Sequence, residues 1–187
     1  MAYLSEYKLL NMGFKSLGRN VKVSEKASVY DCEQIEIGDD SRIDDFCVVS
    51  GKVKIGSNVH ITPQCLIAGG EPGLVIKDFV ALAYGVKVFT QSDDYSGETL
   101  TNSTIPQKYK REFKKQIVIN KHVIIGAGSI IMPGVTIGVG AAVGANSLLL
   151  KPIREWVIVA GSPAKEIGKR KKNLLELEEL YLSERNK

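Results

Sequence analysis

Histidine and cysteine are scarce in this 187-residue chain, which has two histidines and three cysteines. The cysteines Cys32, Cys47 and Cys65 are an odd number and lack the spacing of a metal site. Cys47 and Cys65 are 18 residues apart, and we expect them to be free thiols stacked on one another. This pattern predicts a reducing compartment and no metal centre.

Strong charge and long apolar runs are also missing. The formal net charge is +4, and no dense basic stripe is interleaved with aromatic residues, so we expect no nucleic-acid partner. The chain has no signal peptide and no membrane-length apolar run, which predicts a cytoplasmic location and no membrane partner. Its length is sufficient for one domain with a substantial core.

The chain instead has an aliphatic residue at every sixth position in three runs, 37–67, 76–88 and 119–149. Helices repeat near 3.6 residues and half-buried strands near 2, so neither accounts for this period. A corner after each short strand, with three strands to an 18-residue coil, predicts a hexapeptide-type parallel β-helix, an all-β solenoid. The period residues are Ile37, Ile43, Val49, Ile55, Ile61, Ile67, Ile76, Leu82, Val88, Ile119, Ile125, Ile131, Ile137, Val143 and Leu149.

Departures from the period define the expected organisation of the chain. Residues 1–20 are predicted to form a helical cap, because an open solenoid end exposes unpaired apolar surface. Residues 21–167 form the predicted β-helix, and the polar excursion 89–117 is too long for a simple connector. Residues 168–187 have a basic start and then apolar residues at helical spacing, which predicts a C-terminal helix.

Glycine-rich phrases in the C-terminal half carry a family resemblance. They are Ile125–Ser129, Pro133–Gly138, Val143–Ser147 and Gly161–Lys165. The chain resembles the hexapeptide-repeat acetyltransferases, a group that includes the galactoside, maltose and xenobiotic acetyltransferases. The phrase Ser92–Gly97 is similar to sugar acetyltransferases of O-antigen and capsule (lipopolysaccharide and surface polysaccharide) pathways. More narrowly, the chain resembles the N-acetyltransferases that act on dTDP-linked amino-dideoxy sugars.

The resemblance implies a left-handed coil, although right-handed crossovers are the general preference. It also implies a homotrimer in which acetyl-CoA, the co-substrate, lies in the groove between two chains. Small residues at the coil edge would hold the pantetheine arm as an added strand. The lysines would meet the adenosine end and the phosphates, although the cluster 169–172 also fits a solvated helix start. The cofactor-binding positions implied are Gly126, Ala127, Ala145, Lys151, Lys165 and Lys169.

Asp93 stands where galactoside and maltose acetyltransferases carry a histidine that deprotonates a sugar hydroxyl. An aspartate with a pKa of about 3.9 is a poor base for a hydroxyl, but it can assist an amine that is partly neutral near pH 7. This difference favours N-acetylation of an amino sugar over O-acetylation.

Asp93, Asp94 and His60 are the candidate catalytic residues. The aspartate pair also fits a simple loop turn, and His60 also fits a corner residue that faces solvent. We expect His122 to be structural.

Glu71 and Tyr95 are the candidate substrate-binding residues, because coil counting places the insertion 69–73 and the long excursion on comparable sides. The expected reaction is direct attack of the amine on the thioester in a ternary complex. No cysteine has the setting of a nucleophile, so no acyl-enzyme is needed. A corner amide near Gly126 or Ala127 is the expected oxyanion donor.

The same residues leave other functions open. A sugar O-acetyltransferase and a non-catalytic β-helix binding protein are the alternatives, and the intact Gly161–Lys165 phrase argues against the second. A zinc enzyme of the γ-type carbonic anhydrase kind needs three histidines, and this chain has two.

Overall fold

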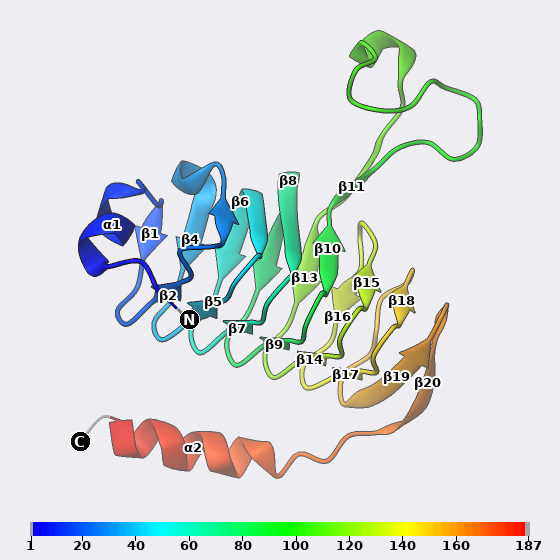
Figure 1. The fold of residues 1–187 in the computed structure, drawn as a ribbon. Coiled ribbons are helices and arrows are strands. Elements are labelled where there is room, and N and C mark those ends of the chain that lie inside the picture. Colours follow the sequence, from blue (N-terminus) through cyan, green and yellow to red (C-terminus); the bar gives the residue numbers. More distant parts are fainter. Residues whose placement is uncertain (1, 186–187) are drawn as a thin grey trace.

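The structure is a computed structural model that describes residues 2–185. Short strands pair in parallel and coil into a three-sided prism, with a small helix at one end and a longer helix alongside (Figure 1). The expected parallel β-helix with two terminal helices is therefore confirmed. No helix within residues 2–185 is long and apolar enough to cross a membrane.

One side of the prism is a separate sheet. It runs in the order β2-β5-β7-β9-β14-β17-β19, and β20 adds an antiparallel edge strand to β19. The residues of one coil therefore lie directly against their equivalents in the next. Its strands are β2 (Lys22–Val23), β5 (Arg42–Ile43), β7 (His60–Ile61), β9 (Ala81–Leu82), β14 (Ile124–Ile125), β17 (Ala142–Val143), β19 (Val157–Gly161) and β20 (Ala164–Lys169).

The other two sides share one sheet. They are joined because β6 and β8 run unbroken through a corner, at Gly51 and Gly70, where φ is 73° and 48°. The strands of this sheet are β1 (Ser16–Leu17), β3 (Ser28–Val29), β4 (Ile35–Ile37), β6 (Val48–Ile55), β8 (Leu66–Ile76), β10 (Lys87–Phe89), β13 (Ile117–Ile119), β15 (Ile130–Ile131), β16 (Thr136–Ile137) and β18 (Leu148–Leu149). A short 3-10 helix, η1 (Cys32–Gln34), precedes β4.

The six-residue period forms the core, as predicted. Every period residue from Ile37 to Leu149 is at most 4% exposed. Three serines near the corners are also buried, and they do more than allow tight turns. Ser41, Ser129 and Ser147 each donate a hydrogen bond to a glycine carbonyl at 2.7–3.0 Å. Polar groups in the tight corners are thus satisfied inside the prism.

Three corners separate the sides, and their residues stack from coil to coil. The excursion 89–117 and the insertion 69–73 leave from corner C, which also contains Gly51. Helix α2 covers corner B, which is formed by Asp40, Asn58, Phe79, His122 and Gly140. Corner A is formed by Asp45–Phe46, Pro63–Gln64, Tyr84–Gly85, Ala127–Gly128 and Ala145–Asn146.

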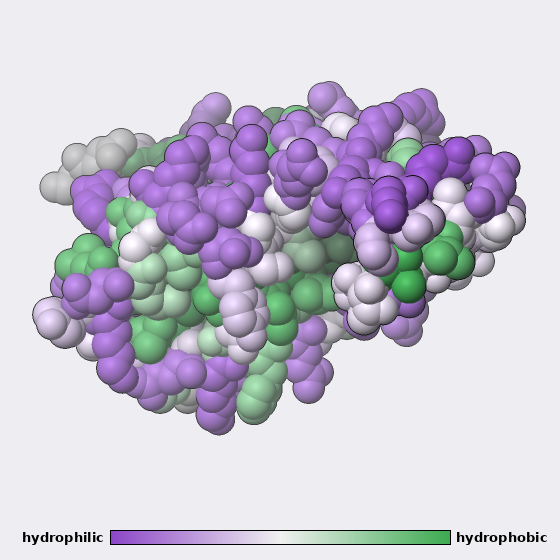
Figure 2. All heavy atoms as spheres, turned by 90° about the horizontal axis from the view of Figure 1, so that it is seen from above, coloured by the Kyte–Doolittle hydropathy of each residue, from purple (hydrophilic) through white to green (hydrophobic). Residues whose placement is uncertain are grey.

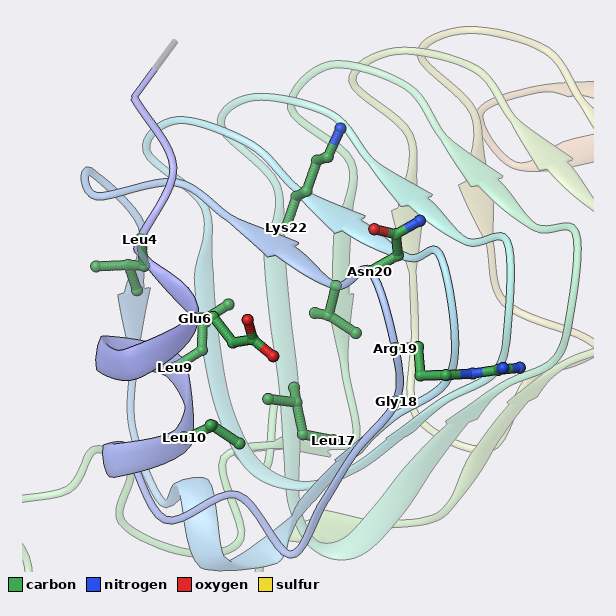
Figure 3. A pocket seen from close by; sticks show the side chains of 10 residues that line it. Leu4, Glu6, Leu9, Leu10, Leu17, Gly18, Arg19, Asn20 and Lys22 are labelled. Atoms are coloured by element: carbon green, nitrogen blue, oxygen red, sulfur yellow. The ribbon is translucent and has the colours of Figure 1, made fainter.

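Helix α1 (Glu6–Asn11) covers the open N-terminal end. Ser5 caps it by accepting a hydrogen bond from the Lys8 amide at 3.3 Å. Leu9 and Leu17 line the hollow between this helix and the first strands (Figure 3). The helix is shorter than the expected cap of residues 1–20, because the chain already pairs with β4 at Ser16; residue 1 lies outside the described residues.

Helix α2 (Leu174–Arg185) runs back along the prism toward the N-terminal end (Figure 1). It begins later than the expected residue 168, because pairing with β19 keeps residues up to Lys169 in β20. The basic cluster 169–172 therefore precedes the helix and is not its first turn. Residues 186–187 of the expected helix lie outside the described residues.

Candidate active site

The excursion at corner C stands away from the prism on a two-stranded stem. Strands β11 (Gln91–Ser92) and β12 (Phe113–Lys114) pair antiparallel, and the 3-10 helix η2 (Gln107–Tyr109) lies near the tip. Figure 1 shows the excursion projecting beyond the coil body. Figure 2 shows the molecule from above, where hydrophilic and hydrophobic residues both reach the surface. The stem fixes where the excursion leaves the prism, so the polar residues after β11 have a defined position.

The insertion 69–73 lies at the foot of this stem. It is contained in β8, which pairs with β10 before the excursion and with β13 after it. Thr90 donates a hydrogen bond to the Gly69 carbonyl at 2.6 Å, and Lys114 Nζ lies 3.6 Å from Glu71 Oε2. The two segments thus leave the coil at the same corner, as coil counting predicted.

Asp94 is bound within its own loop. Its carboxylate accepts hydrogen bonds from the Ser96 amide at 2.9 Å and from the Thr99 hydroxyl at 3.0 Å. Hydrogen bonding from Ser96, and then from Thr99, lowers the pKa of Asp94 to about 2. These contacts fit the loop-turn alternative for this residue better than a proton-accepting role.

Asp93 is less constrained than its neighbour. Oδ2 accepts one long hydrogen bond from the Asn102 amide at 3.3 Å, and within residues 2–185 no hydrogen bond to Oδ1 is formed. Asp93 and Asp94 both line a hollow of about 340 Å³ together with Tyr95, Arg111 and Phe113. Tyr95 is 90% exposed, so its ring is available to a ligand. This arrangement can accept a proton or a hydrogen bond from a polar ligand.

His60 lies on a different side of the prism. Its Nε2 is 2.8 Å from Oδ2 of the buried Asp44 and 3.0 Å from Nε of Arg42. Because β7 and the excursion belong to different sides, one chain does not bring His60 and Asp93 together. Arg42 and Asp44 were not singled out from the sequence, although Arg42 and His60 are 18 residues apart and pair in register.

Gly126, Ala127 and Ala145 lie at corner A on two consecutive coils. The Asn146 amide donates to the Ala127 carbonyl at 2.8 Å, which stacks the two alanines. A Cβ placed on Gly126 would lie 2.4 Å from the Ala145 nitrogen, so close coil stacking itself requires glycine there. The two alanines leave a smooth corner against which an extended ligand fits.

Lys151 and Lys165 come together at the C-terminal end of the prism. Both line a hollow of about 390 Å³ whose other walls include Leu150 and Pro163. Lys169 is not part of it and lies four residues further along β20, opposite Val157. The structure therefore groups two of the three expected cofactor lysines.

Two other residues of the basic cluster, Arg170 and Lys172, contact the β-helix. Arg170 donates to the His122 carbonyl at 2.6 Å and to the Gly140 carbonyl at 3.1 Å. Lys172 Nζ lies 5.2 Å from the centre of the Trp156 ring. These contacts favour the structural alternative for Arg170 and Lys172.

Comparisons with known proteins agree with this architecture. The family "Bacterial transferase hexapeptide (six repeats)" matches residues 34–69. The chain is 42% identical over 184 residues to a dTDP-4-amino-4,6-dideoxy-D-glucose acyltransferase of Escherichia coli, covering 97% of this chain and 95% of the relative. It is 38% identical over 133 residues to a galactoside O-acetyltransferase of Lactococcus lactis, covering 64% of this chain and 63% of the relative.

A solved structure matches over nearly the whole chain. AntD, an N-acyltransferase from Bacillus cereus in complex with dTDP and 3-hydroxybutyryl-CoA, has a TM-score of 0.97, 43% identity, and coverage of 99% of this chain and 98% of that chain. A variant of AntD is solved with dTDP-4-amino-4,6-dideoxyglucose and coenzyme A. With this agreement in coil, excursion and terminal helices, the chain belongs to the hexapeptide-repeat acyltransferases.

Proposed function

We propose that the protein transfers an acyl group from acyl-CoA, with acetyl-CoA as the expected donor, to the amino group of a dTDP-linked 4-amino-4,6-dideoxy sugar. This proposal rests on the similarity of the whole chain, including the excursion, to AntD, a variant of which is solved with both a dTDP-amino sugar and coenzyme A. The O-acetyltransferase relative covers only 64% of this chain, so it supports the fold more than the acceptor.

The co-substrate is proposed to lie along corner A. Its phosphates meet Lys151 and Lys165, and Lys169 adds charge further along β20. Its pantetheine arm passes Ala145 and then Ala127, where small side chains permit close approach to the coil edge. This path brings the thioester toward the middle of the prism, near the Ala127 amide, which is proposed to face the oxyanion. The Gly126 amide donates to the Val143 carbonyl at 2.8 Å and is not available for this role.

Asp93 is proposed to hold the sugar amine. In the transfer, the amine nitrogen attacks the thioester carbonyl carbon, so a C–N bond forms and the C–S bond breaks. The nitrogen loses one proton and the departing thiolate takes up one, which yields the amide and CoA thiol. Asp93 Oδ1 is open to the amine, whereas the Asp94 carboxylate holds the loop. Glu71 and Tyr95 flank the same corner and are proposed to contact the nucleotide sugar.

A homotrimer is proposed to complete the site. His60 and Asp93 lie on different parts of one prism, so a shared site between neighbouring copies is the arrangement that unites them. We further propose that the enzyme works in the cytoplasm for surface polysaccharide biosynthesis; its free cysteines suit a reducing compartment.

The test supplies acetyl-CoA with dTDP-4-amino-4,6-dideoxyglucose and measures free thiol together with the mass of the sugar product. Thiol release that depends on the amino sugar, with the mass of one added acetyl group, is the expected result. Release with dTDP-glucose but not with the amino sugar favours the O-acetyl alternative. Asp93→Asn is expected to lower kcat by about tenfold or more.

A further inference from the structure

We infer that Tyr84 sets the length of the acyl chain that the protein accepts from its CoA thioester. The inference rests on the proposed function, because it takes the co-substrate path along corner A as given. It adds a specificity residue to the candidate site residues named above.

Tyr84 continues the row of residues that the co-substrate is proposed to follow. The Gly128 amide donates to the Tyr84 carbonyl at 2.8 Å, just as the Asn146 amide donates to the Ala127 carbonyl at 2.8 Å. Tyr84, Ala127 and Ala145 therefore occupy equivalent positions on three consecutive coils. A ligand that passes Ala145 and then Ala127 meets Tyr84 next.

The side chains of this row change abruptly in size. Ala145 and Ala127 present a single methyl group each, whereas the Tyr84 ring is 63% exposed at the corner surface. Gly85 follows it with φ of 68°, and no atom lies within 4 Å of a Cβ placed there. The ring thus stands beside open space and is not packed into the core.

The direction of the co-substrate places its acyl group at this ring. Lys151 and Lys165 lie at the C-terminal end of the prism, so the thioester end points toward the N-terminal coils. Successive coils are about 4.8 Å apart, as neighbouring strands are. A two-carbon acyl group at Ala127 ends before the next coil, whereas a four-carbon chain enters the space that the Tyr84 ring occupies.

Tyr84 acts through the size of its ring and not through its hydroxyl group. Within residues 2–185 the phenol of Tyr84 forms no hydrogen bond. The wild-type protein is therefore expected to prefer acetyl-CoA over butyryl-CoA and 3-hydroxybutyryl-CoA by at least about tenfold in kcat/KM. Its relative AntD is solved with 3-hydroxybutyryl-CoA, so longer donors are compatible with the fold.

The experiment measures kcat/KM with the three donors and dTDP-4-amino-4,6-dideoxyglucose for wild type, Tyr84→Phe, Tyr84→Leu and Tyr84→Ala. Tyr84→Phe is expected to keep the acetyl preference, and Tyr84→Ala to reduce it at least tenfold, with Tyr84→Leu between them. Tyr30→Ala is the matched control, because Tyr30 is 58% exposed and follows β3 on the side toward corner C, away from corner A. Its donor ratio should equal that of wild type.

Two results would overturn the inference. One is a ratio of kcat/KM for acetyl-CoA to kcat/KM for the longer donors that stays within twofold of wild type in Tyr84→Ala. The other is an equal loss of kcat/KM with short and long donors in that variant. If no donor reacts with the amino sugar, the proposed function fails, and the inference is then decided by binding. Calorimetry then measures the Kd of butyryl-CoA and of acetyl-CoA for wild type and for Tyr84→Ala. The ratio of the butyryl-CoA Kd to the acetyl-CoA Kd should fall at least tenfold in Tyr84→Ala, and an unchanged ratio refutes the inference.

Discussion

Oε2 of Glu178 on helix α2 lies 2.8 Å from Nε2 of His122 at corner B, and the two side chains are 10% and 7% exposed. Lys121 Nζ reaches the other carboxylate oxygen at 2.5 Å, and the His122 ring stacks on Phe79 with ring centres 5.3 Å apart. This contact joins the C-terminal helix to the coil. It gives His122 the structural role that we expected from the sequence.

Glu178→Gln should therefore weaken the attachment of α2. Removing one partner of a shielded ion pair leaves the other charges without compensation, so we expect a loss of about 1–2 kcal/mol and a fall in Tm of roughly 2–8 °C at pH 7. Calorimetry measures it, and Glu179→Gln on the exposed face of the helix is the control. Equal Tm values for the two variants contradict the role given to Glu178.

The carboxylate of Glu178 should also make the stability of the protein depend on pH. Burial opposes its ionisation, but hydrogen bonds from Lys121 and His122 outweigh burial and lower the pKa of Glu178 below its ordinary value. Stability from a lowered carboxyl pKa is present above the unfolded pKa of about 4.3 and is lost as pH falls through the folded pKa. The Tm difference between wild type and Glu178→Gln should thus shrink between pH 6 and pH 3.

Much of the fold was predictable because a six-residue period is a local signal. Within uninterrupted coils each residue of that period pairs with its equivalent 18 residues away, so the spacing fixes the partner there. Across the insertion 69–73 and the excursion 89–117 the separation is longer, and only the return of the period shows which residues pair. The predicted bounds of the terminal helices were less accurate, because these bounds depend on strand pairing with distant residues. Ser16 pairs with β4, and Lys169 pairs with β19.

The candidate site was predictable only in part. The small residues of corner A and the acidic excursion could be found from phrases in the sequence. The charged group around Asp44 could not. The 18-residue spacing aligns Arg42 with His60, but side-chain direction decides that both also contact Asp44. Asp93 and Asp94 are adjacent and chemically identical, and only the Ser96 and Thr99 contacts of Asp94 distinguish them.

Gly126→Ala should destabilise the coil. The new methyl group would meet the Ala145 nitrogen at 2.4 Å, and this backbone atom cannot move without disturbing the next coil. Overpacking of this kind costs about 1–3 kcal/mol, or roughly 2–12 °C in Tm for a domain of this size. Gly168→Ala is the control, because its nearest atom, Cδ1 of Ile158, is 4.0 Å away. A similar Tm for both variants would show that the coils separate more easily than the contact suggests.

The thiols should differ in reactivity. Cys47 and Cys65 are 0% and 1% exposed, whereas Cys32 is only half-buried. A hydrogen bond with Cys65, and then burial, raises the pKa of Cys47, while burial followed by the Glu33 charge raises that of Cys32. A thiol-specific disulfide reagent should modify slowly at most one thiol per folded chain and three after unfolding. Rapid modification of three thiols in the folded protein contradicts the buried stack.

Ser96→Ala should loosen the hold on the carboxylate of Asp94. The Ser96 hydroxyl contributes most to holding the pKa of Asp94 at about 2, whereas the backbone amide of residue 96 and the Thr99 hydroxyl still donate in the variant. The pKa should therefore rise only part of the way toward the ordinary value of about 3.9. Carboxyl carbon NMR of selectively labelled protein follows this change, and Ser103→Ala in the same excursion is the control. Because Asp94 stays ionised above pH 4 in the wild type, it should contribute no inflection to the pH profile of the activity near neutrality. An inflection that shifts in Ser96→Ala would return Asp94 to the reaction.

Lys151→Ala and Lys165→Ala should each weaken the binding of CoA itself. The two ammonium groups line one hollow at the C-terminal end of the prism, where charge-assisted contacts to phosphate oxygens are proposed. We expect Kd to rise by about 3- to 10-fold for each variant, and by a larger factor at low ionic strength, because salt screens exposed charges. Lys171→Ala is the matched control, since Lys171 is an exposed member of the basic cluster outside this hollow. If Lys171→Ala weakens CoA binding and the other two variants do not, the phosphates lie beside the segment before α2, and the direction proposed for the co-substrate along corner A is wrong.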